Sequence, residues 1–410
     1  MTISTNKKPK MLFVGISPQL DFSGQGKVAA GLLHYFKEFF DISVAGWGCT
    51  PETVNSLKIY SNSEEWWKVL EQESFDILFL SHDIFRFSQL PEVRKKYPNL
   101  KIIGYFTIDG CPIIKSWLPI LEACDVIVTP SQWSSNVILE RFTRKPVFVI
   151  PNGIHLKVWK KQIDKLLFKQ EIDNATLEMD KEANKKLYIK DKFIILFVGV
   201  NQDRKNLASL LSGYSMFLNR IKETYLFVFT YTAKFELFGD SLPKGYDLDD
   251  IFLWKNIIGN LKINQAIQDE TLLLKVYQAS DLLVLPSCGE GFGLPIIEAM
   301  ATGVIPLISN YSSMREVPKE ALFLKVNAFQ KVTTWNANRA IVTPEEVYFS
   351  LLNAYSIWKN NKELWKQMQE RNWQEVDKYD WQNASFKFIK ILTNLLNGYF
   401  YYNSELRRMG

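Results

Sequence analysis

The sequence is poor in cysteine and histidine. Its 410 residues include four cysteines, none of them in a C-x-x-C pair, and three histidines, no two of which are close together. Isolated cysteines argue against a disulfide framework and against a zinc module, and so few histidines argue against a multi-histidine metal site. We therefore expect a reducing, cytoplasmic environment and no metal at the functional site.

Long apolar runs are missing as well. No run approaches the ~18–20 residues that a membrane span needs, and the apolar stretch after Lys10 meets polar Ser17 too soon for a secretory signal. These features predict a protein without a transmembrane segment. Peripheral contact with a membrane stays open for the basic segment 157–169, which we interpret as a solvated helix, and for the aromatic helix expected over 381–402.

Charge of one sign is not in strong excess either. The 49 Lys and Arg residues against 44 Asp and Glu residues give a net charge of +5, which permits an anionic ligand but does not require one. No basic stripe with interleaved aromatic residues is present, so a nucleic acid is an open partner that the sequence does not favour.

The sequence does have a strand–loop–helix pattern, which begins twice, near residues 11 and 193. The strands are short continuous apolar runs, typical of parallel strands that are buried on both faces. The pattern predicts two doubly wound α/β domains, with boundaries at 1–155 and 191–380 and a polar linker over 156–190. The expected strands cover 11–16, 42–45, 77–81, 102–106, 126–129 and 147–150, then 193–200, 225–230, 282–286 and 304–309.

The segment PSCGEGFGLPIIEAMA, residues 286–301, is the most informative motif. It follows an expected strand, and its three closely spaced glycines would let the backbone approach a ligand. Pro295 suits the first turn of a helix, whose free N–H groups and dipole favour an anion such as phosphate. Glu290 lies in the loop, and we place Glu298 in the first turn of that helix, facing the same opening.

Two carboxylates beside a phosphate would be repelled by it unless they bind hydroxyl groups on either side. A nucleotide sugar has that layout, because its diphosphate lies between a sugar and a ribose. The alternative is a glycine-rich turn with two solvated glutamates. The spacing Glu290-x7-Glu298, with the run 277–287 (YQASDLLVLPS) before it, resembles the signature of retaining GT-B glycosyltransferases of the family 4 type, also called group 1.

This resemblance implies a fold and a set of roles. The fold would be GT-B, with two Rossmann-like domains facing across a cleft, residues 1–155 on the acceptor side, residues 191–380 on the nucleotide-sugar side, and a C-terminal helix over 381–410 that returns to the first domain. Glu290 would contact the donor sugar and Glu298 the ribose of the nucleotide. Phe292, Gly293 and Leu294 would bring backbone amides to the sugar and phosphate.

A second motif, GVNQDRKN over 199–206, follows the strongest expected strand. Two cations match the roughly two negative charges of a diphosphate, and Asn206 is a plausible N-cap for the helix expected from Leu207. The resemblance assigns Arg204 and Lys205 to the leaving group. A charged surface turn is the alternative.

The first domain carries weaker signals. The segment 23–27 (SGQGK) is not a dinucleotide-binding fingerprint, but it resembles the loop through which this family's first domain reaches the donor, so Gly24 and Gly26 are candidates for sugar binding. Asp109, where many relatives carry histidine, is expected to contact the reacting sugar or the acceptor. His82 and Asp83 are candidates for the acceptor or for a supporting role.

Two further patterns are set aside. His155 follows a Pro-Asn-Gly segment that resembles the family's hinge, and we interpret it as structural. The D-x-D pattern within 247–250 is too weak to indicate a metal, and we assign neither metal nor cofactor.

The expected activity is metal-independent transfer of a sugar from a nucleoside-diphosphate sugar to a hydroxyl, with retention of configuration. A glycan, a lipid-linked sugar, a protein or a modified DNA base remain open as acceptors. The alternatives are a nucleotide-sugar epimerase of the same fold and a non-catalytic sugar-nucleotide-binding partner subunit.

Overall fold

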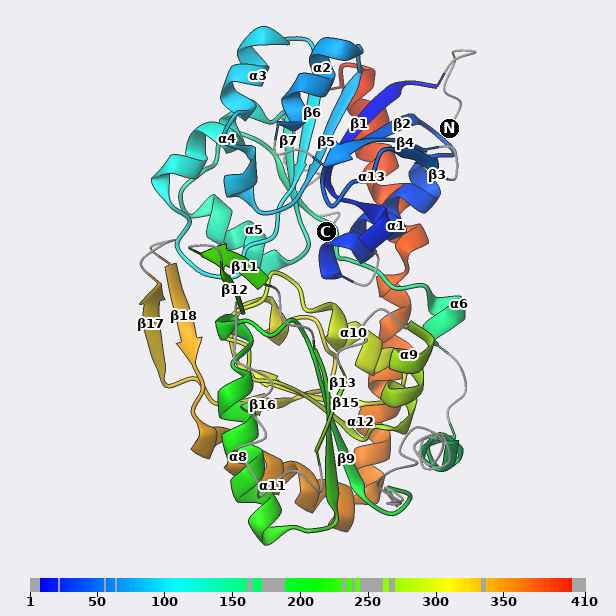
Figure 1. Ribbon diagram of the computed structural model, residues 1–410, viewed down its shortest axis with the longest axis vertical. Coiled ribbons are helices and arrows are strands. Elements are labelled where there is room, and N and C mark those ends of the chain that lie inside the picture. Colours follow the sequence, from blue (N-terminus) through cyan, green and yellow to red (C-terminus); the bar gives the residue numbers. More distant parts are fainter. Residues whose placement is uncertain are drawn as a thin grey trace. The chain divides into compact units, whose positions relative to one another are not determined.

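The computed structural model describes residues 8–20, 23–54, 57–62, 65–160, 164–171, 189–230, 234–237, 240–243, 261–264, 270–332 and 337–399. The chain divides into two compact units (Figure 1). Unit 1 comprises Met1–His155, Lys331–Asn338 and Lys378–Gly410, and unit 2 comprises Leu156–Gln330 and Arg339–Asp377.

Unit 1 is built on an eight-stranded sheet with the order β3-β4-β2-β1-β5-β6-β7-β8. All neighbours pair in parallel except β3 and β4. The order reverses between β1 and β5, which makes the carboxyl ends of these two strands a topological switch point, where ligands bind in such sheets. The strands are β1 (Lys10–Ile16), β2 (Asp41–Trp47), β3 (Glu52–Val54), β4 (Leu57–Asn62), β5 (Ile77–Ser81), β6 (Lys101–Tyr105), β7 (Val126–Thr129) and β8 (Val147–Val149).

Short helices connect these strands because the buried apolar runs leave both faces of the sheet to be covered. They are α1 (Gly24–Phe36), α2 (Val69–Gln72), α3 (Leu90–Lys96), α4 (Leu118–Ala123) and α5 (Gln132–Leu139), with 3-10 turns at Pro18–Leu20, Trp66–Lys68, Ile84–Phe87 and Lys115–Trp117.

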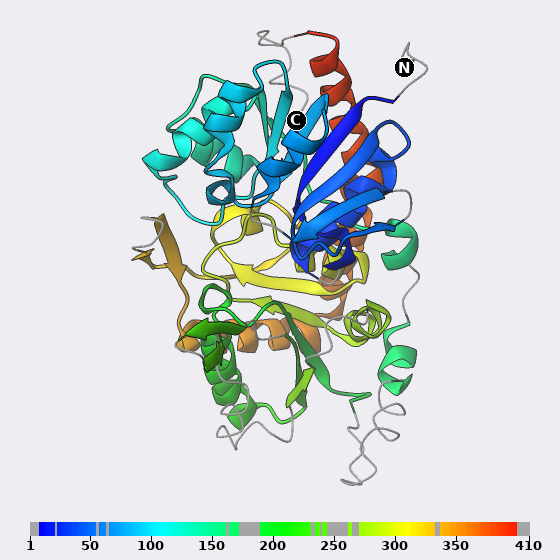
Figure 2. The same cartoon turned by 45° about the horizontal axis from the view of Figure 1, so that its top comes forward.

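The last helix of the chain, α13 (Trp381–Leu396), packs in unit 1, as the resemblance implied (Figures 1 and 2). Its Phe388 ring lies 5.4 Å from the ring of Phe79 and 4.9 Å from that of Tyr105. Trp381 lies against Gly31 of α1, where an added Cβ would be 2.3 Å from the indole ring. Only glycine permits this approach, so α1 and α13 are fitted to each other by residues 350 positions apart in sequence.

Unit 2 contains a six-stranded parallel sheet with the order β13-β10-β9-β14-β15-β16. Its order reverses between β9 and β14, so the loops after these two strands lie at the switch point. The strands are β9 (Phe193–Val198), β10 (Thr224–Phe229), β13 (Leu261–Asn264), β14 (Leu282–Leu285), β15 (Ile305–Ser309) and β16 (Leu322–Leu324). Two separate strand pairs are β11 (Lys234–Leu237) with β12 (Asp240–Pro243), and β17 (Ala328–Val332) with β18 (Ala337–Ile341).

Helices cover both faces of this second sheet. Helix α8 packs against α11, and α9 and α10 lie on the other side of the strands from α8 (Figure 1). The helices are α6 (Leu156–Trp159), α8 (Leu207–Arg220), α9 (Glu270–Ala279), α10 (Leu294–Ala301), α11 (Pro344–Asn360) and α12 (Lys362–Glu375), with 3-10 turns at Asp203–Lys205, Ser312–Arg315 and Val376–Tyr379.

Two expectations need correction. Residues 23–27 do not form a loop ahead of the first helix: Ser23 is the N-cap of α1, its hydroxyl accepts from the Gly26 N–H at 3.0 Å, and Gly24 begins the helix. The segment 157–169 is not simply a solvated helix, because Lys169 is 5% exposed and pairs with Asp281 at 2.8 Å. A charge so buried is retained only with a partner, which the amphipathic pattern did not reveal.

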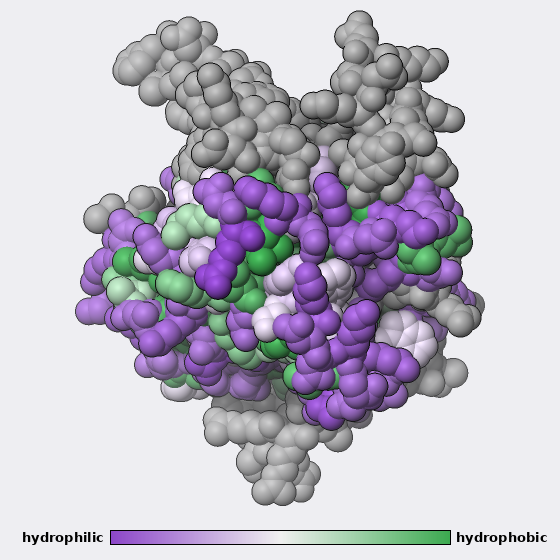
Figure 3. Space-filling view, turned by 90° about the horizontal axis from the view of Figure 1, so that it is seen from below, coloured by the Kyte–Doolittle hydropathy of each residue, from purple (hydrophilic) through white to green (hydrophobic). Residues whose placement is uncertain are grey.

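The face drawn in Figure 3 is mostly polar, with apolar residues in small patches among them. Scattered apolar residues are normal at a protein surface and need no partner. Among the residues that the structure describes, no helix is long and apolar enough to cross a membrane.

Candidate active site

The loops after β9 and β14 meet in unit 2 at the switch point of its sheet. The turn Asp203–Lys205 follows β9, and the glycine-rich segment 286–293 follows β14. A backbone hydrogen bond from the Cys288 N–H to the Arg204 carbonyl, 2.7 Å long, joins the two loops. The topology therefore brings together two motifs that are more than 80 residues apart in sequence.

Arg204, Lys205 and Glu290 form one ionic cluster. Arg204 Nη1 donates to Glu290 Oε2 at 2.9 Å, and Lys205 Nζ donates to Glu290 Oε1 at 2.5 Å. Glu290 is 5% exposed and Lys205 is 7% exposed, whereas a quarter of the Arg204 side chain reaches solvent. Each carboxylate oxygen thus has its own cation, and the cluster carries a net charge of about +1.

These contacts change the acidity of Glu290. Burial alone would raise the pKa of its carboxyl, because the charged form is desolvated. The charges of Lys205 and Arg204 and the hydrogen bond from Lys205 outweigh burial and lower the pKa to about 2. Glu290 is therefore ionised at any physiological pH, and its negative charge is stabilised by both cations.

The glycine-rich segment leads directly into α10. Gly293 is the N-cap with φ of 94°, a left-handed conformation that glycine adopts without strain. Leu294 and Pro295 open the helix, as the sequence predicts for a proline in the first turn. Phe292 is buried beside them. The start of α10 therefore presents the N–H groups and the positive dipole end that favour an anion.

Glu298 lies deeper in α10 than the sequence suggested. The helix starts at Leu294, so Glu298 falls in its second turn and not its first. It is 2% exposed, and its Oε2 accepts a hydrogen bond from the Tyr277 hydroxyl of α9 at 2.8 Å. Burial first, and then the Glu298 charge, raise the pKa of Tyr277, so this phenol remains a hydrogen-bond donor. The interpretation of two solvated glutamates is wrong for both positions.

Asn206 is the N-cap residue of α8, as the sequence predicted, but it does not cap the helix through its side chain. Its φ of 55° places it in the left-handed region, and its side chain makes no capping hydrogen bond. The side-chain amide instead donates to the Val342 carbonyl at 2.9 Å. Asn206 is thus used to turn the chain after Lys205 and to fasten it to the start of the C-terminal helical region.

In unit 1, a second set of polar residues lies at the carboxyl ends of adjacent strands β5 and β6. Asp83 follows β5, and its Oδ1 accepts a hydrogen bond from Thr107 of the segment after β6 at 3.1 Å. Thr107 in turn accepts from Gln25 of α1, at 3.4 Å. Gln25 lies between the candidates Gly24 and Gly26. The structure thus brings the first turn of α1 together with Asp83.

His82 is mostly buried, and its Nδ1 accepts from the Asp83 N–H at 2.7 Å. The neutral ring therefore carries its hydrogen on Nε2. Its ring packs edge-on against Trp47, with centroids 4.9 Å apart.

Asp109 lies two residues beyond Thr107 and is partly buried. His155 is exposed, 6.1 Å from the ring of His34.

Sequence reasoning missed four residues of the unit 2 site, all of them hydroxyl-bearing. They are Tyr277, which binds Glu298, Ser287 in the loop after β14, and Ser312 and Ser313, whose hydroxyl groups bind the backbone of Glu290. The two adjacent serines follow a strand end, which was a signal that could have drawn attention to them. Residues 247–250, with the D-x-D pattern, lie outside the described residues.

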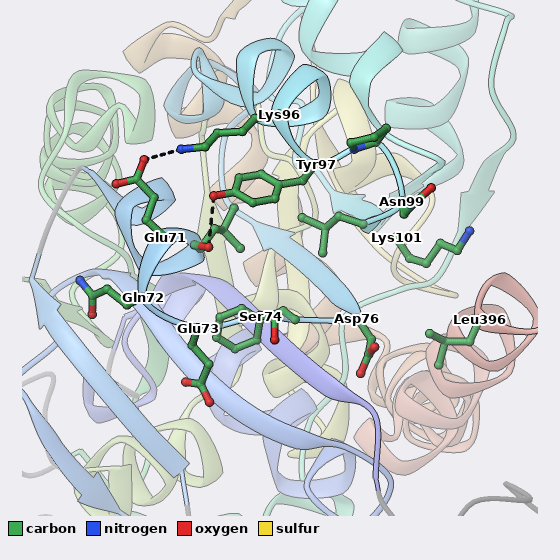
Figure 4. Close-up of a pocket in the computed structure, with 14 residues that line it drawn as sticks. Glu71, Gln72, Glu73, Ser74, Asp76, Lys96, Tyr97, Asn99, Lys101 and Leu396 are labelled. Carbon is green, nitrogen blue, oxygen red and sulfur yellow. Dashed lines mark hydrogen bonds and ion pairs between the residues drawn. The ribbon is translucent and has the colours of Figure 1, made fainter.

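One cavity of about 730 Å³ lies elsewhere, at the amino-terminal edge of the unit 1 sheet (Figure 4). It is lined by segments 70–76 and 96–101, which precede β5 and β6, and by Leu396. Its Glu71 and Lys96 side chains pair with each other at 2.7 Å. Ligands of such sheets bind at the carboxyl ends of strands, and this cavity lies at the other edge of the unit 1 sheet from Asp83 and Thr107.

A family model, "Glycosyl transferases group 1", matches residues 178–328, which include the whole ionic cluster. Among curated proteins, an O-antigen chain mannosyltransferase B of Escherichia coli is 32% identical over 131 residues, 31% of this chain and 31% of that protein. A glycogen synthase of Finegoldia magna is 26% identical over 256 residues, 60% of this chain and 48% of that one. The chain thus spans less than half of the length of these curated relatives.

Solved structures resemble the whole chain at low identity. HepE of Anabaena in complex with UDP and glucose has a TM-score of 0.63 and 11% identity, and covers 94% of this chain and 99% of its own. Sucrose-phosphate synthase of Thermosynechococcus elongatus has a TM-score of 0.68 and 14% identity, with 95% and 100% covered. At such identities the likeness establishes the fold, and the predicted GT-B fold is confirmed.

Proposed function

We propose that this chain, which has the GT-B fold, is a group 1 glycosyltransferase. It would transfer a sugar from a nucleoside-diphosphate sugar to an acceptor hydroxyl with retention of configuration and without a metal. The observation that carries the proposal is the buried cluster of Arg204, Lys205 and Glu290 beside the start of α10. It supplies fixed positive charge and a fixed carboxylate at one point.

The cations suit the leaving group. In transfer, the bond between C1 of the sugar and the diphosphate oxygen breaks, and negative charge accumulates on the diphosphate. Arg204 and Lys205 and the N–H groups at the start of α10 would stabilise that charge as preorganised electrostatics, which in other enzymes contribute the largest single share of catalysis. These residues need no metal to do so.

Glu290 is better suited to bind the donor sugar through hydrogen bonds than to act as a nucleophile. Its pKa of about 2 and its two cationic partners stabilise its negative charge, which makes the carboxylate a weak base and a weak nucleophile. A carboxylate held in this way still accepts hydrogen bonds from sugar hydroxyl groups. We therefore assign Glu290 to the donor sugar, and Phe292, Gly293 and Leu294 to backbone contacts with sugar and phosphate.

Glu298 suits the ribose. Its charge is buried in α10 and one oxygen is occupied by Tyr277, which fixes the orientation of the carboxylate. A ribose diol can donate two hydrogen bonds to such a group. Glu298 would in this way bind the nucleoside, while Arg204 and Lys205 bind its diphosphate.

We assign unit 1 to the reacting sugar and the acceptor. Asp109 is our candidate for the acceptor hydroxyl, and His82 and Asp83 support it from the neighbouring strand end. Gly24 and Gly26, in the first turn of α1, are candidates for the donor sugar. We favour a saccharide acceptor, free or lipid-linked, because the relatives are named for an O-antigen chain and for glycogen.

The experiment combines a donor screen with paired variants. Thermal stabilisation of the protein by UDP, GDP, ADP or their sugars identifies the nucleotide by mass action. Glu290→Gln and Arg204→Ala should then each lower transfer by a factor of about 100 or more. Glu320→Gln and Arg371→Ala are the matched controls, because they break another 2.9 Å Arg–Glu pair in unit 2, one that lies at the surface.

Full activity in both site variants would overturn the assignment. The anomeric configuration of the product, read by NMR, tests retention. Appearance of an epimerised sugar nucleotide without an acceptor would identify an epimerase instead, and binding without any turnover would identify a non-catalytic subunit.

A further inference from the structure

The loop after β15 holds the backbone of Glu290 with two serine hydroxyl groups. Ser312 Oγ accepts a hydrogen bond from the Glu290 N–H at 3.0 Å. Ser313 Oγ lies 2.7 Å from the Glu290 carbonyl oxygen and 3.2 Å from that of Phe292, and donates its hydrogen to them. Ser312 is 3% exposed and Ser313 is fully buried. Both polar groups of the Glu290 backbone are therefore fixed from one side.

The backbone conformation of this loop is unusual. Among the described residues other than glycine, only Asn206 and Ser312 have positive φ, 55° and 56°. One directly follows Lys205, and the other binds the N–H of Glu290. Left-handed conformations cost a side-chain-bearing residue energy and persist where the surrounding structure enforces them, often at functional sites. Both of these conformations flank the ionic cluster.

The segment that these serines hold is rich in glycine. Gly289, Gly291 and Gly293 give it many accessible conformations. The ion pairs constrain only the end of the Glu290 side chain, and a diphosphate would compete with Glu290 for both cations. The hydroxyl groups of Ser312 and Ser313, which we call the hydroxyl clamp, hold the backbone of Glu290 whether Arg204 and Lys205 pair with its carboxylate or with a diphosphate.

We propose that Ser312 and Ser313 are positioning residues for donor recognition: they fix the loop 289–293 so that the Glu290 carboxylate meets the sugar of the donor. The inference rests on the proposed function for the identity of the donor. Its structural half, that the two hydroxyl groups hold the loop, can be tested without any ligand.

The first experiment is amide hydrogen exchange of the ligand-free protein. Ser313→Ala removes one clamp, and Ser312→Gly removes the other while it relieves the left-handed strain. Ser309→Ala is the matched control, because Ser309 is equally buried on β15 but its hydroxyl contacts Leu285, outside the loop. We expect exchange in 289–293 to rise about fivefold to tenfold in both site variants and to stay unchanged in the control.

The second experiment compares a nucleoside diphosphate with its sugar by calorimetry. The probes are UDP with UDP-glucose, GDP with GDP-mannose and ADP with ADP-glucose, and the pair that stabilises the wild type is used. We expect the Kd of the nucleotide sugar to rise about fivefold or more in Ser313→Ala and Ser312→Gly. The Kd of the diphosphate alone should change by less than about twofold, since its partners Arg204 and Lys205 are untouched.

The outcomes separate the inference from the proposed function. Unchanged exchange in 289–293 overturns the inference whether or not any nucleotide binds. Equal losses for diphosphate and nucleotide sugar would also overturn it, since that is what general destabilisation produces. If the wild type binds none of the three pairs while the loop loosens as expected, the clamp stands and it is the proposed function that fails for these donors.

Discussion

Replacing Glu290 by glutamine is the sharpest perturbation of the ionic cluster, because it removes one charge and nearly no volume. In the wild type, Glu290 neutralises one of the two cations that contact it. In the variant, Lys205 would keep its charge in a position that is 7% exposed, without the carboxylate that it contacts at 2.5 Å in the wild type. We expect two opposite effects: the free protein becomes less stable, and its affinity for a nucleoside diphosphate increases.

The magnitude of the first effect follows from two independent routes. Removing one partner of a buried ion pair costs about 3–5 kcal/mol. The pKa of Glu290 falls from 4.5 to about 2 in the folded protein, and at 1.36 kcal/mol per unit this corresponds to about 3 kcal/mol. For a unit of this size, about 3 kcal/mol lowers Tm by roughly 6–12 °C. Glu320→Gln, at a more exposed pair with a 2.9 Å contact, should cost about 0–1 kcal/mol.

The second effect follows from the charge. The cluster changes from about +1 to about +2, so a diphosphate should bind roughly threefold to tenfold more tightly and restore much of the lost Tm. Scanning calorimetry with and without UDP, GDP and ADP, and titration calorimetry with the one that binds, measure both effects. A variant as stable as the wild type that binds the diphosphate more weakly would refute the reasoning.

The pH dependence of stability has a definite sign. Because the pKa of Glu290 in the folded protein, about 2, lies below its ordinary value of 4.5, its contribution to stability is fully present above pH 4.5 and is lost as the pH falls toward 2. Glu290→Gln lacks that contribution at every pH. The stability difference between wild type and variant should therefore shrink between these two pH values, which denaturant titrations at several pH values can measure.

Three other predictions address the rest of the chain. Gly31→Ala should lower the free energy of unfolding by about 1–3 kcal/mol, because the added Cβ would overlap the Trp381 ring. An unshifted thermal midpoint and unchanged tryptophan emission would contradict the packing of α13 on α1. Tyr277→Phe should weaken nucleoside diphosphate binding by about fivefold to tenfold and lower the free energy of unfolding by about 1 kcal/mol, because Glu298 loses the donor that orients it. Equal affinity in a titration would exclude a role for this hydroxyl in binding. Transfer should be unaffected by EDTA, and activity that disappears with the chelator and returns with Mg²⁺ or Mn²⁺ would argue against the metal-free mechanism.

Much of the site could be predicted because its motifs follow strands. Arg204 and Lys205 follow β9, and Glu290 follows β14. Strands that are buried on both faces can be recognised in a sequence as continuous apolar runs. The prediction placed Glu298 in the first turn of its helix, whereas it lies in the second. The N-cap is Gly293, and its left-handed backbone conformation cannot be deduced from the sequence. The strands β3, β4, β13 and β16, at or near the edges of the two sheets, were missed, since each is short and has no more than three apolar residues.

The sequence by itself determined the two doubly wound domains, the glycine-rich helix start and the charged residues that follow the strands, because local periodicity and residue type fix these features. Only the tertiary structure decided which groups are in contact. Glu290 pairs with both Arg204 and Lys205, the Tyr277 hydroxyl donates to Glu298, and Ser312 and Ser313 bind the backbone of Glu290. These contacts join segments that the order of strands in the sheet brings together. A linear pattern does not contain that order.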